Sequence, residues 1–82
     1  MPTNRNQALI YRNVPEFLRR LREQAGFSQR ELAEQIGESQ WWVHRGEIGS
    51  RRVDVAEFIV WCRGCGVEPD EALRQLAKRQ AG

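Results

Sequence analysis

The 82-residue sequence has one histidine and two cysteines, and this scarcity excludes most metal-centred and thiol chemistry. The cysteines form a single CxxC, Cys62-Arg-Gly-Cys65, and no second CxxC accompanies it. A structural zinc site uses about four such ligands, and a redox-active CxxC lies between a strand and a helix, a setting that this sequence does not predict. We therefore interpret Cys62 and Cys65 as small core residues, and we predict neither a metal nor a cofactor.

The sequence also lacks the residue combinations that enzymes use. No serine or carboxylate is placed to form a triad with His44, the single histidine. The sequence has no glycine-rich loop that would hold a phosphate and no paired acidic motif. It thus predicts a protein without enzymatic activity, in which His44 is a surface residue of a helix.

Long apolar runs are absent as well. No run approaches the roughly 18 residues of a membrane span, and the polar first six residues contain no apolar segment of the secretory type. We therefore expect a cytoplasmic protein without a membrane partner. A hydrophobic content of 40% and a charged content of 29% are typical of one globular domain with a single modest core.

Apolar residues recur at helical spacing, and the sequence contains no alternating strand pattern, internal repeat or low-complexity run. This pattern predicts an all-α fold, a compact domain of five short helices over residues 13–80. Residues 1–12 have few core-forming side chains and are predicted to be a flexible N-terminal arm. Within that arm, Leu9 to Tyr11 are candidates to dock on the domain.

Capping residues set the predicted helix boundaries. Ser28 with Glu31 and Asp54 with Glu57 match the capping-box pattern, while Asn13 and Ser39 are candidate caps of two other helices. Glycines that suit helix ends follow at Gly26, Gly37, Gly49 and Gly66. The predicted inward residues are Phe17, Leu18, Leu21, Ala25, Leu32, Ala33, Ile36, Val43, Val55, Phe58, Ile59, Cys62, Cys65, Ala72, Leu73, Leu76 and Ala77.

Two of these helices, Ser28–Ile36 and Gln40–Ile48, are joined by a tight turn at Gly37, which predicts a helix-turn-helix. A basic cluster overlaps the second helix: His44, Arg45, Arg51 and Arg52 accompany one acid, Glu47. The net charge is only +2, so this local concentration says more than the total. A basic patch on a near-neutral domain favours a DNA footprint, and the alternative is a chance cluster of surface arginines.

Taken together, residues Phe17 to Leu76 resemble the lambda-repressor-like helix-turn-helix domain of the XRE family, which includes Cro and phage repressors. No single piece is specific, but the ordered set at these separations carries the resemblance. The matching pieces are Leu18-Arg-Arg-Leu-Arg22, Ala25-Gly-Phe-Ser-Gln29, Glu31-Leu-Ala33, Ile36-Gly37, Ser39-Gln40, Trp42-Val43, Glu47, Gly49, Arg51-Arg-Val-Asp-Val55, Cys62 and Gly66-Val67.

The resemblance implies roles for individual residues. The second helix of the motif would lie in the major groove and read bases with its N-terminal side chains. The implied base-reading residues are Gln40, Trp41, His44 and Arg45, and the implied phosphate-contacting residues are Ser28, Gln29, Arg51 and Arg52. Arg51 and Arg52 have the minor groove as an alternative. Arg22 and Glu47 stand where family members have an internal ion pair, and we predict that pair here.

Two residues depart from the family pattern. Gly46 replaces an apolar or aromatic residue, so either the end of the helix is looser than usual or Trp42 or Trp61 fills the gap. Trp41 replaces a small or polar residue. It would pack on thymine methyl groups or deoxyribose, or it would belong to a protein–protein surface.

The sequence therefore predicts a sequence-specific DNA-binding transcriptional regulator, a repressor that binds double-stranded DNA as a homodimer. Leu73 and Leu76 are the candidate dimer surface, with closure of the monomer core as the alternative. Two other functions stay open. One is an antitoxin that also binds a toxin partner, and the other is a helical protein-interaction module that does not bind DNA.

Overall fold

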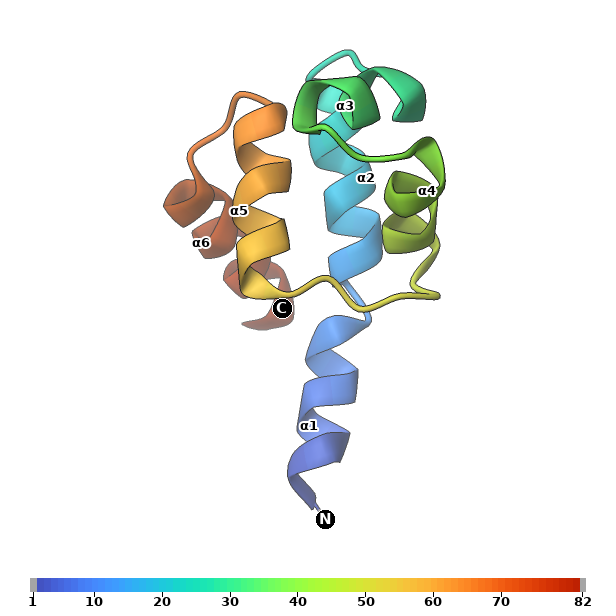
Figure 1. Ribbon diagram of the computed structural model, residues 1–82. Coiled ribbons are helices and arrows are strands. Elements are labelled where there is room, and N and C mark those ends of the chain that lie inside the picture. The colour runs from blue at the N-terminus through green and yellow to red at the C-terminus, as the bar shows by residue number, and fades with distance from the viewer. Residues whose placement is uncertain (1, 82) are drawn as a thin grey trace.

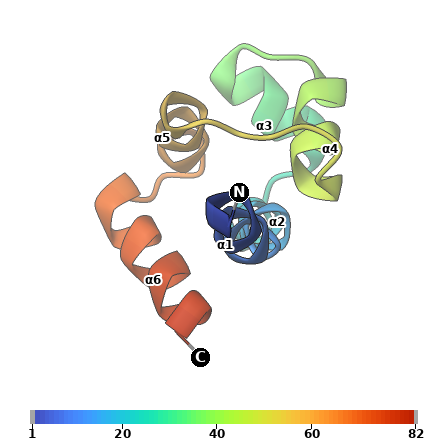
Figure 2. The same ribbon diagram turned by 90° about the horizontal axis from the view of Figure 1, so that it is seen from below.

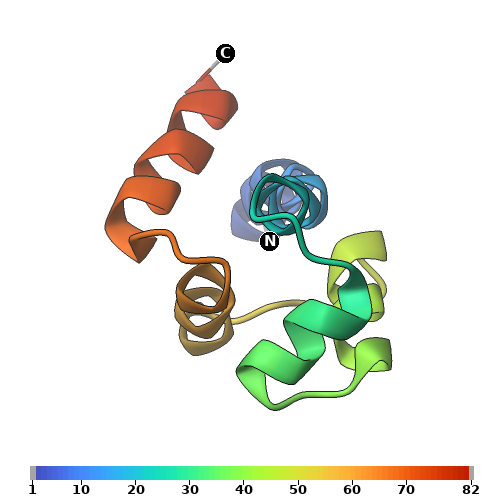
Figure 3. The ribbon, with the colours of Figure 1, turned by 90° about the horizontal axis from the view of Figure 1, so that it is seen from above.

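The computed structural model describes the backbone of residues 2–81, and within that range it contains six helices and no strand (Figure 1). Their bounds are α1 Pro2–Tyr11, α2 Val14–Gln24, α3 Gln29–Ile36, α4 Gln40–Ile48, α5 Val55–Gly64 and α6 Pro69–Ala81. Helices α2 to α6 correspond to the five predicted helices, so the predicted all-α class is confirmed. Figures 2 and 3 show α3 and α4 together on one side of the molecule and α6 on the other.

Helix α1 lies where the sequence predicted a flexible arm over residues 1–12. It extends away from the body at the start of α2, in nearly the same direction as α2 (Figures 1 and 2). Asn13, the expected side-chain cap of α2, keeps right-handed helical angles and makes no such capping bond, so the chain turns little between the helices. The Tyr11 hydroxyl accepts a 2.6 Å hydrogen bond from the Val53 amide. Tyr11 therefore docks on the domain, whereas Leu9 and Ile10 are exposed.

The core lies between α2, α3, α4, α5 and α6, and Trp61 of α5 is its largest fully buried side chain. The Trp61 indole Nε1–H donates to the Leu18 carbonyl oxygen at 3.1 Å, which satisfies the one polar group that the ring brings inside. The sequence did not place Trp61 on the inward face of its helix. It placed Val55 there instead, but Val55 is 77% exposed because it occupies the first turn, beyond the core.

The turn between α3 and α4 forms as its sequence predicts. Ser28 and Glu31 form a complete capping box at the start of α3. Gly37 ends that helix at φ 74°, a conformation that favours glycine, and the Ser39 hydroxyl accepts from the Trp42 amide to begin α4. These local bonds fix the direction in which α4 leaves the turn.

Gly46 allows α4 to approach the core closely. A Cβ atom at this position would lie 3.1 Å from Cζ3 of Trp61 and 3.4 Å from Cγ2 of Val53. The Trp61 ring thus fills the space of the missing side chain, as one of the two sequence-based alternatives expected. Gly64 has a similar role in α5, because a Cβ there would overlap Cγ2 of Ile36 in α3.

Candidate nucleic-acid interface

Helix α4 faces the core with Val43, Gly46 and Glu47 and faces solvent with its first turn. Gln40 and Trp41 are exposed, and His44 and Arg45 one turn later are half-buried. The four predicted base-reading side chains therefore belong to one side of α4, from its first turn to Arg45. They form a surface that a helix in a major groove would present to base edges.

A buried ion pair holds α4 against α2. Arg22 Nε donates to one Glu47 carboxylate oxygen at 2.6 Å and Nη2 donates to the other at 3.0 Å. Arg22 Nη1 also donates to the Phe27 carbonyl oxygen at 2.8 Å. The hydrogen bond to Glu47 raises the pKa of the Arg22 guanidinium. This is the pair expected from the family resemblance, in a bidentate geometry that fixes both side chains.

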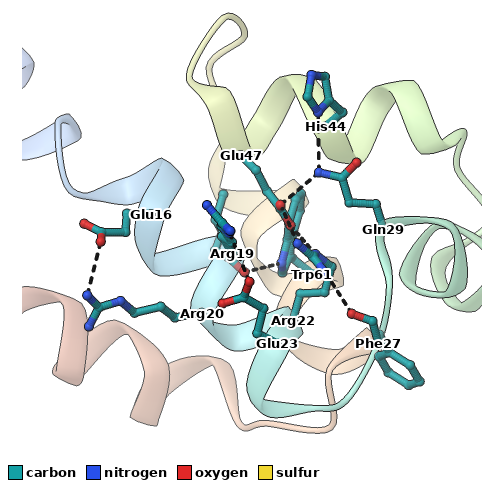
Figure 4. Close-up of polar contacts among 11 residues, drawn as sticks. Glu16, Arg19, Arg20, Arg22, Glu23, Phe27, Gln29, His44, Glu47 and Trp61 are labelled. Carbon is teal, nitrogen blue, oxygen red and sulfur yellow. Dashed lines mark hydrogen bonds and ion pairs between the residues drawn. The ribbon is translucent and has the colours of Figure 1, made fainter.

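Gln29 extends the ion pair toward the exposed surface (Figure 4). Its Nε2 donates to Glu47 Oε1 at 3.1 Å and lies 3.4 Å from Nδ1 of His44. Both hydrogens of the amide nitrogen are therefore directed at groups of the protein itself. The sequence assigned Gln29 to a phosphate contact, whereas this geometry makes it a link between the buried pair and His44.

Trp41 and His44 form a stacked pair beside this link. Their ring centroids are 5.6 Å apart and their planes differ by 28°. The pair lines a surface hollow of about 510 Å³ together with Gln29 and Gln40. The Trp41 side chain is 63% exposed, so a broad apolar face is held in a fixed orientation beside polar amides.

Arg51 contacts the body of the domain. Its Nη1 pairs with Glu57 at 2.9 Å, its Nη2 donates to the Trp42 carbonyl oxygen at 3.2 Å, and its guanidinium lies 4.4 Å from the centre of the Trp42 ring. The side chain is only 17% exposed. Arg51 therefore has a structural role, because a carboxylate and an aromatic face lie within its reach. Its phosphate contact stays a prediction.

The phosphate contacts predicted for Arg52 and Ser28 stay predictions. Arg52 is exposed, and its guanidinium lies 4.3 Å from the centre of the Tyr11 ring. The Ser28 hydroxyl oxygen accepts from the Glu31 amide. Hydrogen bonds from Ser28 lower the pKa of Glu31, so a carboxylate charge lies at this helix end and weakens its attraction for anions.

The two predicted dimer residues have different environments. Leu76 is 7% exposed and belongs to the monomer core, as the alternative interpretation expected. Leu73 is 56% exposed. It borders an apolar groove of about 200 Å³ whose other lining residues are Tyr11, Val14, Val53, Asp54, Val55, Phe58 and Leu76.

The CxxC is buried, with both thiols free. Burial raises the pKa of Cys62 to about 11 and that of Cys65 to about 12. At neutral pH almost no thiolate is present, so neither sulfur is a good nucleophile or metal ligand. Among the described residues, no three His, Cys, Asp or Glu side chains are grouped so as to hold a metal ion.

Comparison with known proteins identifies the family. Residues 16–77 match the model of a helix-turn-helix domain family. The structure is similar to that of an XRE-family like protein from Pseudomonas syringae pv. tomato str. DC3000, with a TM-score of 0.85, 35% sequence identity and coverage of 95% of each chain. No curated protein matches the chain. The chain belongs to the XRE-type helix-turn-helix family, and this membership supports a DNA-binding regulator.

In the part of the chain that the structure describes, no helix combines the length and the apolar character that crossing a bilayer requires.

Proposed function

We propose that this protein is a sequence-specific transcriptional repressor that places α4 in the major groove of its operator. The observation that carries the proposal is the exposed first turn of α4. Gln40 and Trp41 face outward there, while the Arg22–Glu47 pair anchors the last turn of the same helix. A rigid helix with an unpaired polar and aromatic end suits base reading, because its side chains need little reorganisation on binding.

A salt titration tests DNA binding itself. Selection from a random DNA pool supplies an operator, and its affinity is then measured over a range of salt concentrations. We expect log K to fall linearly with log salt at a slope of about −0.9 per phosphate contacted. Absence of salt-sensitive binding to any DNA at low salt would contradict the proposal.

Two arginine variants separate base reading from phosphate contact. Arg45→Ala is expected to lower the preference for the operator over random DNA, by about 1–3 kcal/mol if Arg45 reads a guanine. Arg52→Ala is expected to weaken all sequences alike and to reduce the salt slope by about one. Arg74→Ala is the matched control, because Arg74 is an exposed arginine of α6 that forms an exposed ion pair with Glu71. This control should leave both quantities unchanged.

We infer that the repressor is a homodimer that pairs through the face bearing Leu73. Leu73 and Val55 are exposed apolar residues on this face, and both line the groove described above. Tyr11, the last residue of α1, also lines the groove. The two residues before it, Leu9 and Ile10, are exposed. A two-fold dimer needs one surface that matches itself, and a groove beside exposed apolar residues of a projecting helix satisfies this requirement between two copies.

Sedimentation measures the oligomeric state directly. Leu73→Glu is expected to convert a dimer into a folded monomer, because it places a charge in the groove without disturbing a buried residue. Val60→Glu is the matched control, since Val60 is an exposed apolar residue of α5 that does not line the groove. A monomeric wild-type protein at micromolar concentration would contradict the dimer.

A further inference from the structure

We propose that Trp41 and His44 together read one thymine. In this arrangement the Trp41 indole packs on the C5-methyl group and His44 Nε2–H donates to O4. The inference rests on the proposed function, since it specifies what the exposed turn of α4 recognises. It starts from the chemistry of the major groove, where thymine alone among the four bases displays a methyl group, directly beside its O4 acceptor.

Trp41 supplies the apolar half of this site. Its ring is 63% exposed, yet stacking on His44 at 5.6 Å between ring centroids holds its orientation. The ring is flanked by the side-chain amides of Gln29 and Gln40 in one hollow. The hollow thus places hydrogen-bonding groups directly beside one apolar face.

His44 supplies the polar half, and the buried ion pair fixes its proton. The Glu47 carboxylate only accepts hydrogen bonds, so the Gln29 side chain must turn its nitrogen, and not its oxygen, toward Glu47 Oε1 at 3.1 Å. The same nitrogen lies 3.4 Å from His44 Nδ1. Because that nitrogen is a donor, Nδ1 acts as the acceptor in this contact, and this arrangement assigns the ring N–H to Nε2.

The second ring nitrogen of His44 points away from Gln29 and out of the domain (Figure 4). It therefore presents a donor to whatever lies over α4. Thymine O4 accepts from such a donor. The N4 amino group of cytosine occupies the equivalent place and is itself a donor, so cytosine is disfavoured there. Trp41 and His44 side by side thus match the methyl group and the acceptor of one base.

Base analogues test the two halves separately. In one series, each thymine of the selected operator is replaced in turn by uracil, which removes only the methyl group. In a second series, each thymine–adenine pair is replaced by a 5-methylcytosine–guanine pair, which keeps the methyl group and removes the O4 acceptor. At one thymine we expect uracil to weaken wild-type binding about fourfold, the value of one buried methyl group. At the same position we expect 5-methylcytosine to weaken it about tenfold.

Three variants assign these effects to residues. Trp41→Ala is expected to abolish the thymine–uracil difference and keep the thymine–methylcytosine difference. His44→Ala is expected to do the reverse. Gln29→Leu should resemble His44→Ala, because Gln29 is a positioning residue that acts through the imidazole ring. Val60→Ala, an exposed apolar residue of α5 outside the hollow, should change neither ratio. Circular dichroism verifies that each variant is folded.

The outcomes distinguish this inference from the proposed function. Salt-sensitive binding with a thymine–uracil ratio near one at every position would overturn the inference alone. A wild-type ratio that survives in Trp41→Ala would also overturn it, and would leave a protein partner as the use of Trp41. Absence of binding to any DNA would overturn both proposals. Loss of the thymine–uracil ratio in Trp41→Ala, with the thymine–methylcytosine ratio intact, would establish that Trp41 reads the methyl group.

Discussion

Gly46 of α4 lies so close to Trp61 of α5 that a Cβ atom there would be 3.1 Å from Cζ3 of the indole. Trp61 is fully buried and its Nε1–H donates to the Leu18 carbonyl oxygen, so the ring cannot easily move away. Gly46, one of the two departures from the family pattern, is thus accommodated by the Trp61 ring that packs against it.

Gly46→Ala is therefore expected to destabilise the fold although alanine favours helix. Overpacking costs about 1–3 kcal/mol, and the helix propensity of alanine returns about 1 kcal/mol, so we expect a net loss of up to about 2 kcal/mol in urea unfolding. In a Trp61→Phe background, where the outer ring is absent, the same substitution should be neutral or stabilising. Equal effects in both backgrounds would show that the contact with Trp61 does not restrict position 46.

Glu47 is the residue whose loss should damage the domain most. Glu47→Ala leaves the buried Arg22 guanidinium without its partner and Gln29 without its acceptor, and we expect a loss of about 3–5 kcal/mol in the free energy of unfolding. Glu16→Ala is the control, because it removes an exposed glutamate from the i,i+4 pair with Arg20 and should cost less than about 1 kcal/mol. Thermal melting followed by circular dichroism measures both, and similar melting of the two variants would contradict a structural role for the pair.

The adjacent arginines of the α4–α5 loop should separate stability from DNA affinity. Arg51→Ala removes an ion pair with Glu57 and a stacked guanidinium, and we expect a stability loss of about 1–3 kcal/mol. Arg52→Ala should leave unfolding nearly unchanged and weaken DNA binding. Chemical denaturation and fluorescence anisotropy with labelled DNA measure the two quantities. The reverse assignment would mean that Arg51 leaves the Trp42 ring when DNA binds.

The buried thiols predict a loss of stability in alkali. The folded-state pKa values of about 11 and about 12 lie above the ordinary value of 9.0, so the unfolded chain releases these protons first. The stabilising effect is complete below pH 9 and is lost as the pH rises toward 12. We expect the free energy of unfolding to fall between pH 9 and 10.5, and to fall less in Cys62→Ala/Cys65→Ala. Equal slopes for the two proteins would contradict the burial of the thiols.

Local rules predicted most of the fold because its signals are short in sequence. The capping boxes at Ser28 and Asp54, the Ser39 cap and the turn at Gly37 each depend on a few neighbouring residues, and all are present. Helix α1 was missed because its contact, Tyr11 with the Val53 amide, joins residues far apart in the chain. Apolar spacing likewise could not show that Val55 and Leu73 lie beyond the core while Trp61 lies inside it.

The candidate site was less predictable than the fold, for a related reason. The residue types suited to DNA are present in the sequence, but their partners come from other helices. Arg51 could be assigned to phosphate only while Glu57 and the Trp42 ring were unknown neighbours. Gln29 could be assigned there only while its bond to Glu47 was unknown. One signal was available, since Gln29 and Glu47 both belong to the family pattern, but their spacing did not indicate a contact.

The chain of contacts from Arg22 through Glu47 and Gln29 to His44 has a consequence for how such a regulator changes over evolution. Trp41 and Gln40 have no part in this chain, so substitutions there can alter the preferred operator while the domain stays equally stable. The orientation of His44 depends, through Gln29, on the Glu47 carboxylate, which the fold itself requires. New operator preferences should therefore arise first at positions 40 and 41, and position 44 should change only in lineages that have also rebuilt the interior.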